Sequence, residues 1–475
     1  MPPTRRLSRS TELLYGVGAV AFGVKDNGFS FFLLLYYNQV LGLPEAWVGF
    51  GIMLALILDG IFDPLVGFMS DHLHSRWGRR HPFMYAAALP VAASYGLLWD
   101  PPSGLSHGQL FAYFVVISVL VRVFISVYEI PSAALVPELT DHYDERTTIL
   151  SYRYFFGWWG GLAMSVLAYA VFLQPDATHP TGVLNPAGYH RYGIVASVVM
   201  LIAILVSALG THPYIPYLKQ PPATRAVGLM GALRELRETV SNRSFLALFV
   251  AAIFGFVAAG VMAALSIYFN TYFWELTSNE ISVFVLVGFP AAVFAGGLAP
   301  VLSRRLGKKR AAITIALTAM AVAPLPVVLR LLGWFPANKS PALLPTLMAV
   351  NLIAISLIIV TSILISSMVA DVAEDSEVST GRRSEGVFVA ATAFVQKSTS
   401  GIGIFASSLL LGGIGFPRGA TPGQVDAEVI RTLGVVYLPV VIGLYLLMVG
   451  ALTAYRIDRA THEENLRRLA GSRAG

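Results

Sequence analysis

Residues 46–71 read AWVGFGIMLALILDGIFDPLVGFMSD, an apolar stretch that two aspartates interrupt and a third ends. A helix crosses the roughly 30 Å hydrocarbon core of a bilayer with about 20 residues, so this stretch is long enough to span it. Comparable stretches recur along all 475 residues, of which 56% are hydrophobic and 13% charged. Soluble proteins carry roughly 25% charged residues. The sequence therefore predicts an all-α, multi-pass membrane protein.

The same pattern, followed outward from residues 46–71, predicts the number of membrane spans and their orientation. Twelve spans are expected, beginning at roughly residues 12, 46, 82, 108, 150, 192, 244, 280, 309, 342, 386 and 427. An even number of spans places both termini on one side. Basic residues crowd the termini and alternate connections, which predicts that this side is the cytoplasm.

The domain organisation follows from the longest connection. We expect a six-helix bundle over 1–212, a cytoplasmic connection with a short amphipathic helix over 213–243, a second six-helix bundle over 244–456 and a cytoplasmic tail over 457–475. The loop after the second span reads SRWGRRHP and the loop after the eighth reads SRRLGKKR. This weak repeat is typical of transporters built from two parallel halves.

Charge and cysteine content exclude several classes of function. The net charge is +6, but the basic residues stand in loops, so no nucleic-acid partner is implied. Cysteine is absent, which excludes disulfides and thiol chemistry. No phosphate-binding loop, zinc-ligand motif or nucleophile elbow is present, which argues against nucleotide-driven pumping.

Asp59 and Asp63 are the residues of the second span whose insertion into the bilayer costs the most free energy. They are four positions apart and so share one helix face, where like charges repel. A carboxylate at the bilayer centre costs about 2.5 to 3.5 kcal/mol on insertion scales, which predicts that the pair faces a cavity and shares a cation or proton. The alternative is that Asp63 caps a helix break at Pro64 or forms a structural pair.

The fourth span carries Glu129 beside Pro131, with Ser126 one turn earlier. Proline opens the backbone around it, so a carboxylate there can bind a ligand. The alternative is a structural partner for an arginine such as Arg122 or Arg153.

Lys397, in the eleventh predicted span, and Lys25 and Asp26, in the first, are further charges inside apolar segments. An intramembrane lysine needs a carboxylate, and Asp59 and Asp63 are the candidates for Lys397. A purely structural salt bridge is the alternative. Lys25 and Asp26 either contact substrate or form an internal ion pair.

The loop after the second span holds Asp71, Arg76, Arg79 and Arg80. Arginines at such a place can bond helix C-terminal carbonyls and carboxylates in one transport state. These four residues are therefore predicted to take part in gating.

Several motifs, taken together and in order, resemble one family. They are DGIFDPLVGFMSD followed by RWGRRHPF, EIPSAALVPELT with DERTTILSYR, and VADVAEDSEVSTGRRSEG with QKSTSG. They resemble the glycoside-pentoside-hexuronide:cation symporters of the major facilitator superfamily, of which the bacterial melibiose permease is typical. The resemblance implies twelve helices in two bundles around a midplane cavity, with sodium, lithium or proton entry coupled to sugar uptake.

The resemblance also implies roles for individual residues. Asp59, Asp63, Ser126 and Lys397 match cation-binding and coupling positions, and the two aspartates would hold Na⁺ if sodium is the coupling ion. Substrate-binding positions are matched by Lys25, Asp26, Glu129 and Arg153, and Tyr128 could replace a sugar-stacking aromatic residue.

This chain also departs from the permease pattern. Phe62 replaces an asparagine that helps to hold sodium, which makes proton coupling an alternative. Ala133 and Ser362 replace tryptophans that contact sugar, which leaves room for a bulkier substrate.

The sequence thus predicts a cation-coupled symporter, driven by Na⁺ or H⁺, that imports a sugar or glycoside by alternating access. We expect a monomer in the lipid bilayer of a bacterial inner membrane, without a cofactor. One alternative is a symporter for lysolipids or other bulky amphiphiles, since animal lysophospholipid symporters share these motifs. The other is an integral membrane enzyme that uses paired carboxylates.

Overall fold

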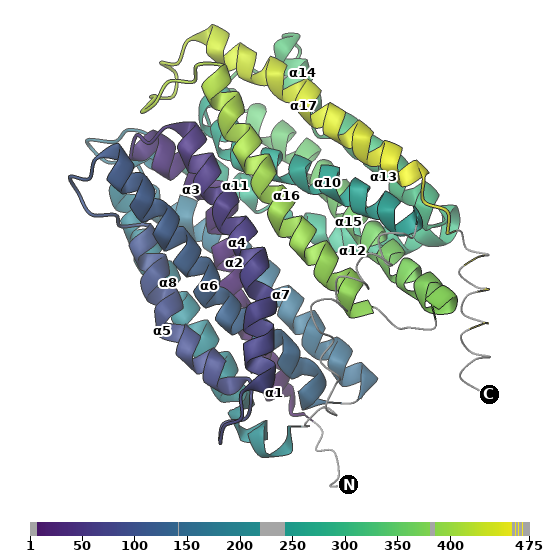
Figure 1. Ribbon diagram of the computed structural model, residues 1–475. Helices are drawn as coiled ribbons and strands as arrows, with labels where there is room; N and C mark the ends of the chain where they lie inside the picture. Colours follow the sequence, from purple (N-terminus) through teal and green to yellow (C-terminus); the bar gives the residue numbers. More distant parts are fainter. Residues whose placement is uncertain are drawn as a thin grey trace. The chain divides into compact units, whose positions relative to one another are not determined.

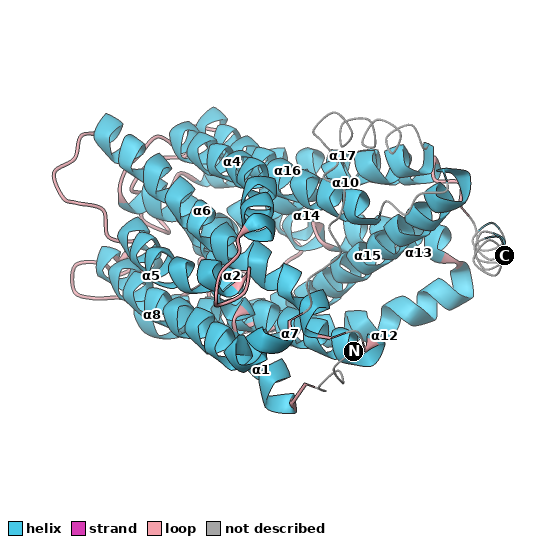
Figure 2. Cartoon of the chain, turned by 60° about the horizontal axis from the view of Figure 1, so that its bottom comes forward, coloured by secondary structure: helices cyan, strands magenta, loops and turns pink. Residues whose placement is uncertain are grey.

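The computed structural model describes residues 7–140, 142–218, 243–380 and 385–457, together with residues 461, 464 and 468. Within these residues the regular structure is entirely helical (Figure 2). Ten segments of the described chain are long and apolar enough to cross a membrane. The spans predicted to begin at roughly residues 82 and 386 fall on helices α5 (His81–Leu98) and α16 (Glu385–Gly413). The all-helical class is confirmed, and the count of twelve stays a prediction.

The chain divides into two compact units. Unit 1 comprises Met1–Thr224, Ala263–Leu286 and Ile404–Val425, and unit 2 comprises Arg225–Met262, Val287–Gly403 and Asp426–Gly475. Two short segments of the later sequence therefore group with the N-terminal helices. The predicted domain boundaries stay a prediction, and most of the predicted connecting segment, residues 219–242, lies outside the described residues.

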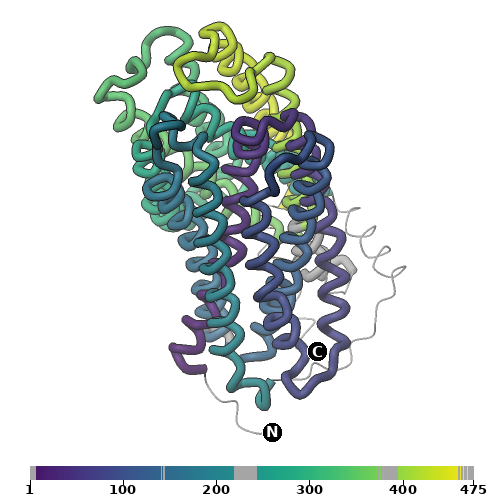
Figure 3. Tube along the Cα trace, turned by 90° about the vertical axis from the view of Figure 1, so that its left-hand side faces the viewer, coloured from purple at the N-terminus to yellow at the C-terminus, as the bar shows by residue number. Residues whose placement is uncertain are grey.

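Unit 1 is built on a bundle of long helices that run alongside one another (Figures 1 and 3). Helix α5 packs against both α6 and α8, and α4 packs against α6. The helices of the N-terminal part are α1 (Arg9–Val17), α2 (Ala19–Asn27), α3 (Leu33–Leu35), α4 (Glu45–His72), α5, α6 (His107–Leu139), α7 (Tyr143–Leu167) and α8 (Pro186–Thr211).

Small residues allow α2 and α7 of unit 1 to approach closely. A methyl group added at Gly23 would lie 1.9 Å from the carbonyl oxygen of Gly157, and one added at Gly161 would lie 2.5 Å from that of Gly23. Glycine at these positions lets the two backbones touch, as is common where membrane helices pack. The contact fixes α7, which carries Arg153, against the first span.

Unit 2 contains a second set of long helices, in which α15 packs against α12 and α13, and α13 packs against α17. Its helices are α12 (Gly288–Leu306), α13 (Lys308–Val322), α14 (Leu325–Leu331), α15 (Leu343–Thr380) and α17 (Ala427–Thr453). Helices α10 (Arg243–Tyr268) and α16 contribute residues to both units, and α11 (Ser278–Val285) belongs to unit 1.

Candidate functional site

The candidate coupling site lies where α4 packs against α6 in unit 1. Helical spacing of four residues places Asp59 and Asp63 on one face of α4, and the same spacing places Ser118, Arg122 and Ser126 on one face of α6. The two polar stripes face each other. Both helices carry internal prolines, at Pro64 and at Pro131 and Pro137.

Asp59 forms a buried ion pair with Arg122. The Arg122 Nη1 atom lies 3.1 Å from Asp59 Oδ2, and the exposed fractions of the two side chains are 4% and 0%. The guanidinium also stacks 4.4 Å above the ring centre of Phe29. Removing one partner from such a pair costs about 3–5 kcal/mol, because it leaves the other charge buried and unpaired. Arg122 is therefore the charge partner that Asp59 has inside the membrane span.

The Ser126 hydroxyl lies between the two aspartates. Its Oγ atom is 2.8 Å from Asp59 Oδ1 and 2.7 Å from Asp63 Oδ1. A serine hydroxyl carries one proton and can donate it to only one acceptor at a time. The second short contact is satisfied when a carboxyl group carries a proton, or when a cation sits among the three oxygen atoms. The geometry thus suits a site that gains or loses one positive charge.

Exposure separates the roles of the two aspartates. Asp59 is buried, whereas Asp63 is half-buried. Asp63 is therefore the more accessible of the two for an arriving ion. Phe62 lies between them on α4 and offers no oxygen, whereas Ser126 brings a hydroxyl oxygen to both carboxylates.

Lys397 lies half-buried on α16 in unit 2. Its predicted pairing with Asp59 or Asp63 would join residues of different units and stays a prediction.

Arg153 of α7 forms the second polar cluster of unit 1. It donates hydrogen bonds to Ser132 Oγ at 2.8 Å and to Tyr15 Oη at 3.2 Å. Its second amino group reaches the main-chain oxygen of Glu129 at 3.4 Å, and its guanidinium stacks on Phe22. Arg153 thus ties α7 to α1 and to the part of α6 around Pro131.

The Glu129 carboxylate lies beside this cluster and interacts electrostatically with Arg153. Among the described residues no donor bonds its side-chain oxygen atoms, since Arg153 and Ser132 both bond the main-chain oxygen. Arg122 is paired with Asp59, whereas Arg153 interacts electrostatically with Glu129, so the alternative of an arginine partner for Glu129 stays open. The half-buried Glu129 carboxylate, which accepts no hydrogen bond from the described residues, has oxygen atoms that can accept hydrogen bonds from hydroxyl groups of a ligand.

The remaining predicted substrate residues, Lys25, Asp26 and Tyr128, do not take part in the hydrogen bonds given above for Arg153. Lys25 is buried and pairs with Asp26 at 2.7 Å, while the Asp26 side chain is 56% exposed. The expected internal ion pair is present, and contact with substrate stays a prediction. Tyr128 is fully buried, with its hydroxyl packed against Gly18 and Ser207. Its predicted part in substrate binding likewise stays a prediction.

Three of the four predicted gating residues meet at the end of α4. Arg80 pairs with Asp71 at 2.5 Å, and both Arg80 and Arg79 donate to Glu138 Oε1, at 2.9 and 2.7 Å. Glu138, near the end of α6, was not predicted. Arg76 lies instead over the ring of its neighbour Trp77, at 5.3 Å from the ring centre. Gating by these residues stays a prediction.

Comparisons with known proteins identify the family. The family described as MFS/sugar transport protein matches residues 14–459. An uncharacterised symporter of Synechocystis sp. is 26% identical over 97% of this chain and 96% of its own length. The isoprimeverose transporter of Lactiplantibacillus pentosus is 24% identical over 95% of this chain and 89% of its own length.

Solved structures share the fold. A bacterial homologue of the iron transporter ferroportin, in an inward-facing state, matches with a TM-score of 0.65 at 15% identity, over 94% of this chain and 100% of that chain. The resemblance that the motifs indicated is confirmed at the level of the family. With ten membrane-capable helices in its described part, this chain belongs to the MFS/sugar transport family and is a multi-pass membrane transporter rather than an enzyme.

Proposed function

We propose that this protein is a cation-coupled symporter that imports a sugar or glycoside, with Asp59, Asp63 and Ser126 as the coupling site. The observation that carries the proposal is the single Ser126 hydroxyl within hydrogen-bond distance of both carboxylates. Relatives named as symporters and as an isoprimeverose transporter support the assignment of class and substrate. The finer topology, twelve spans with both termini cytoplasmic in a bacterial inner membrane, is part of the same proposal.

The coupling step is the arrival of one positive charge at the cluster. With Asp59 held by Arg122, a proton or cation at Asp63 relieves the repulsion between the two carboxylates and completes the hydrogen bonding of Ser126. A proton on Asp63 fits both Ser126 contacts, because the protonated carboxyl donates to Ser126 Oγ while the Ser126 hydroxyl donates to Asp59. Sodium remains the second coupling ion to be tested.

The substrate site proposed here is the Glu129 carboxylate. A carboxylate that accepts hydrogen bonds from two adjacent hydroxyls recognises a diol, and charged acceptors form stronger bonds than neutral ones. Arg153 holds the main-chain oxygen of Glu129, so its part is to position the acceptor. A monomer is expected to suffice for both sites.

Uptake into proteoliposomes tests the proposal. Labelled isoprimeverose, xylose, a glucuronide and a lysophospholipid are offered separately, with a pH gradient, a sodium gradient or neither. The proposal expects sugar or glycoside uptake that one gradient drives and that Asp63→Asn abolishes. Uptake of the lysophospholipid alone, or sugar uptake that ignores both gradients, contradicts it. Glu428→Gln removes an exposed carboxylate on α17 and serves as the matched control.

A further inference from the structure

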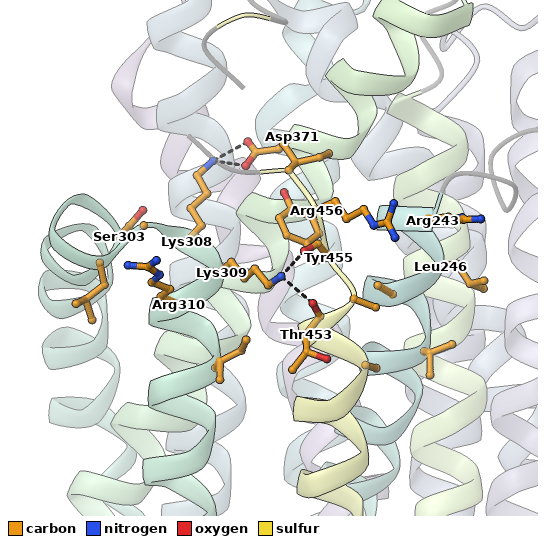
Figure 4. A pocket seen from close by; sticks show the side chains of 18 of the residues that line it. Arg243, Leu246, Ser303, Lys308, Lys309, Arg310, Asp371, Thr453, Tyr455 and Arg456 are labelled. Atoms are coloured by element: carbon orange, nitrogen blue, oxygen red, sulfur yellow. Dashed lines mark hydrogen bonds and ion pairs between the residues drawn. The ribbon is translucent and has the colours of Figure 1, made fainter. Parts of the chain in front are cut away.

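A basic cavity lies within unit 2 (Figure 4). It has a volume of about 1670 Å³, and its lining includes six cationic side chains and one carboxylate, that of Asp371. The cationic residues are Arg243, Arg304, Lys308, Lys309, Arg310 and Arg456. The proposed transport function uses none of them.

The two lysines are already bonded inside the protein. Lys308 Nζ lies 2.6 and 2.8 Å from the two carboxylate oxygens of Asp371. Lys309 Nζ donates to the main-chain oxygens of Thr453 and Tyr455, where α17 ends. Both ammonium groups therefore hold the walls of the cavity together, as the dashed lines in Figure 4 show.

The four arginines differ from the lysines. Arg243, Arg304, Arg310 and Arg456 are exposed, and none has an ion pair or hydrogen-bond partner for its side chain among the described residues. Guanidinium groups match phosphate oxygens with paired hydrogen bonds. The first turn of α13, whose N-cap Gly307 has no side chain to bond its amides, adds positive potential at the same place. The cavity is thus equipped for a phosphorylated anion.

The position of the cavity distinguishes a lipid from a soluble anion. Four membrane-capable segments begin or end at its rim, at Arg243, Leu306, Lys308 and Thr453. The lining continues from this basic rim into the spans along apolar residues, among them Leu246, Val250 and Ile313. A free phosphate gains nothing from contact with apolar side chains. A phospholipid instead places its headgroup at the basic rim and its acyl chains against the apolar lining.

The size of the cavity agrees with this choice. Sites for small molecules occupy roughly 300–1,000 Å³, and this cavity exceeds that range. We propose that it binds an anionic phospholipid of the phosphatidylglycerol or cardiolipin class, with Arg304, Arg310 and Arg456 on the phosphate. The bound lipid bridges the start of α10, the α12–α13 turn and the end of α17.

Thermal unfolding of the delipidated full-length protein in detergent tests the proposal. Cardiolipin, phosphatidylglycerol, phosphatidylethanolamine and soluble glycerol phosphate are added separately over a concentration series. A ligand that binds only the folded state raises the melting temperature with its concentration. The proposal expects a rise with the two anionic lipids and little change with phosphatidylethanolamine or glycerol phosphate.

The triple variant R304Q/R310Q/R456Q locates the effect. These side chains make no bonds to the described residues, so the variant is expected to unfold at the wild-type temperature without lipid. Each lost charge-assisted bond weakens lipid binding by about tenfold. The triple Arg→Lys variant is expected to retain much of the affinity, because the charge remains. Arg431→Gln, an exposed arginine at the opposite end of α17, is the matched control and is expected to bind lipid normally.

Three results overturn the proposal. Equal stabilisation of the wild type and the triple glutamine variant places any lipid elsewhere. Stabilisation by glycerol phosphate at the same concentration as by phosphatidylglycerol assigns the cavity to soluble anions. Stabilisation by phosphatidylethanolamine equal to that by cardiolipin shows that the arginines do not select for charge.

Discussion

The α4–α6 pair of unit 1 and the α12–α15 pair of unit 2 end alike and differ inside the membrane. After α4, Gly78 has a φ of +72°, and Arg79 and Arg80 reach Glu138 at the end of α6. After α12, Gly307 has a φ of +77°, and Lys308 reaches Asp371 on α15. Positive φ favours glycine at both turns. The basic turn followed by a carboxylate on a later helix is therefore a shared structural element.

The interiors of the two helix pairs are different. In unit 1, α4 carries Asp59 and Asp63, and α6 carries Arg122 and Glu129. In unit 2, α12 has no charged residue before Arg304, and α15 has none before Asp371. A buried charge is costly in a membrane, and the α4–α6 pair carries such charges inside its spans whereas the α12–α15 pair carries none before Arg304 and Asp371. This difference supports the proposal that Asp59 and Asp63 of unit 1 couple the ion, while Lys397 of unit 2 stays a predicted member of the site.

The largest expected effect comes from neutralising the coupling aspartates. Asp63→Asn is expected to abolish gradient-driven uptake, because an amide neither takes up a proton nor balances a cation, while the protein still folds. Asp59→Asn is expected to lose uptake and also about 3–5 kcal/mol of stability, since Arg122 is left unpaired. Uptake assays and thermal unfolding measure the two effects separately.

A double variant sharpens this result. In D59N/R122Q no charge stays buried alone, so most of the stability lost in Asp59→Asn is expected to return, without return of uptake. Uptake in the double variant at wild-type rates would show that the ion pair is structural only.

The ion pairs at the two shared turns are expected to contribute different amounts to the free energy of unfolding. Glu138→Gln removes one carboxylate partner of the buried Arg80. This is expected to lower the free energy of unfolding by about 2–4 kcal/mol. Asp371→Asn removes the carboxylate partner of Lys308, whose side chain is 29% exposed and can be solvated instead. The free energy of unfolding is therefore expected to fall by only about 1 kcal/mol. Denaturation of the two variants side by side checks the order. Equal losses would mean that burial does not distinguish the turns.

Removal of the Glu129 carboxylate is expected to weaken substrate binding without abolishing uptake. Glu129→Gln is expected to weaken sugar binding by about 10- to 100-fold, the value of one or two charge-assisted hydrogen bonds. The response of binding to the cation is expected to persist, because Asp59 and Asp63 are intact. Binding titrations at several cation concentrations provide the test. Unchanged sugar affinity would remove Glu129 from the substrate site.

The smallest change concerns Ser126. Ser126→Ala removes one hydroxyl and is expected to lower the apparent affinity for the coupling ion by about tenfold, whereas Ser126→Thr keeps the hydroxyl and the affinity. The ion dependence of uptake in the two variants measures this. Identical ion dependence in the wild type and Ser126→Ala would contradict a shared hydroxyl.

Much of the fold could be predicted from the sequence, because in a membrane protein span length and loop charge depend on local residues alone. The helical class and the segments long enough to cross a membrane follow from apolar runs. Asp59, Asp63 and Ser126 could be singled out for a similar reason, since a polar group inside such a run stands out.

Pairings between helices could not be predicted, because they depend on the rotation and register of each helix. Arg122 reaches Asp59 across 63 positions, although the sequence suggested Arg122 as a partner for Glu129. Arg122 stands four residues before Ser126, and this spacing could have shown that both residues lie on the same face of their helix. Glu138 was missed for the same reason, since a glutamate near a loop end gives no local sign of the arginines that it binds.

The most direct test of the central claim is the affinity of the purified protein for its sugar, measured across pH with and without sodium, in the wild type and in Asp63→Asn. Coupling is reciprocal, so the ion must change sugar affinity by the factor by which sugar changes ion affinity. The account predicts that wild-type affinity rises with one of the two ions and that Asp63→Asn is indifferent to both. An Asp63→Asn protein that retains the wild-type ion dependence would contradict it.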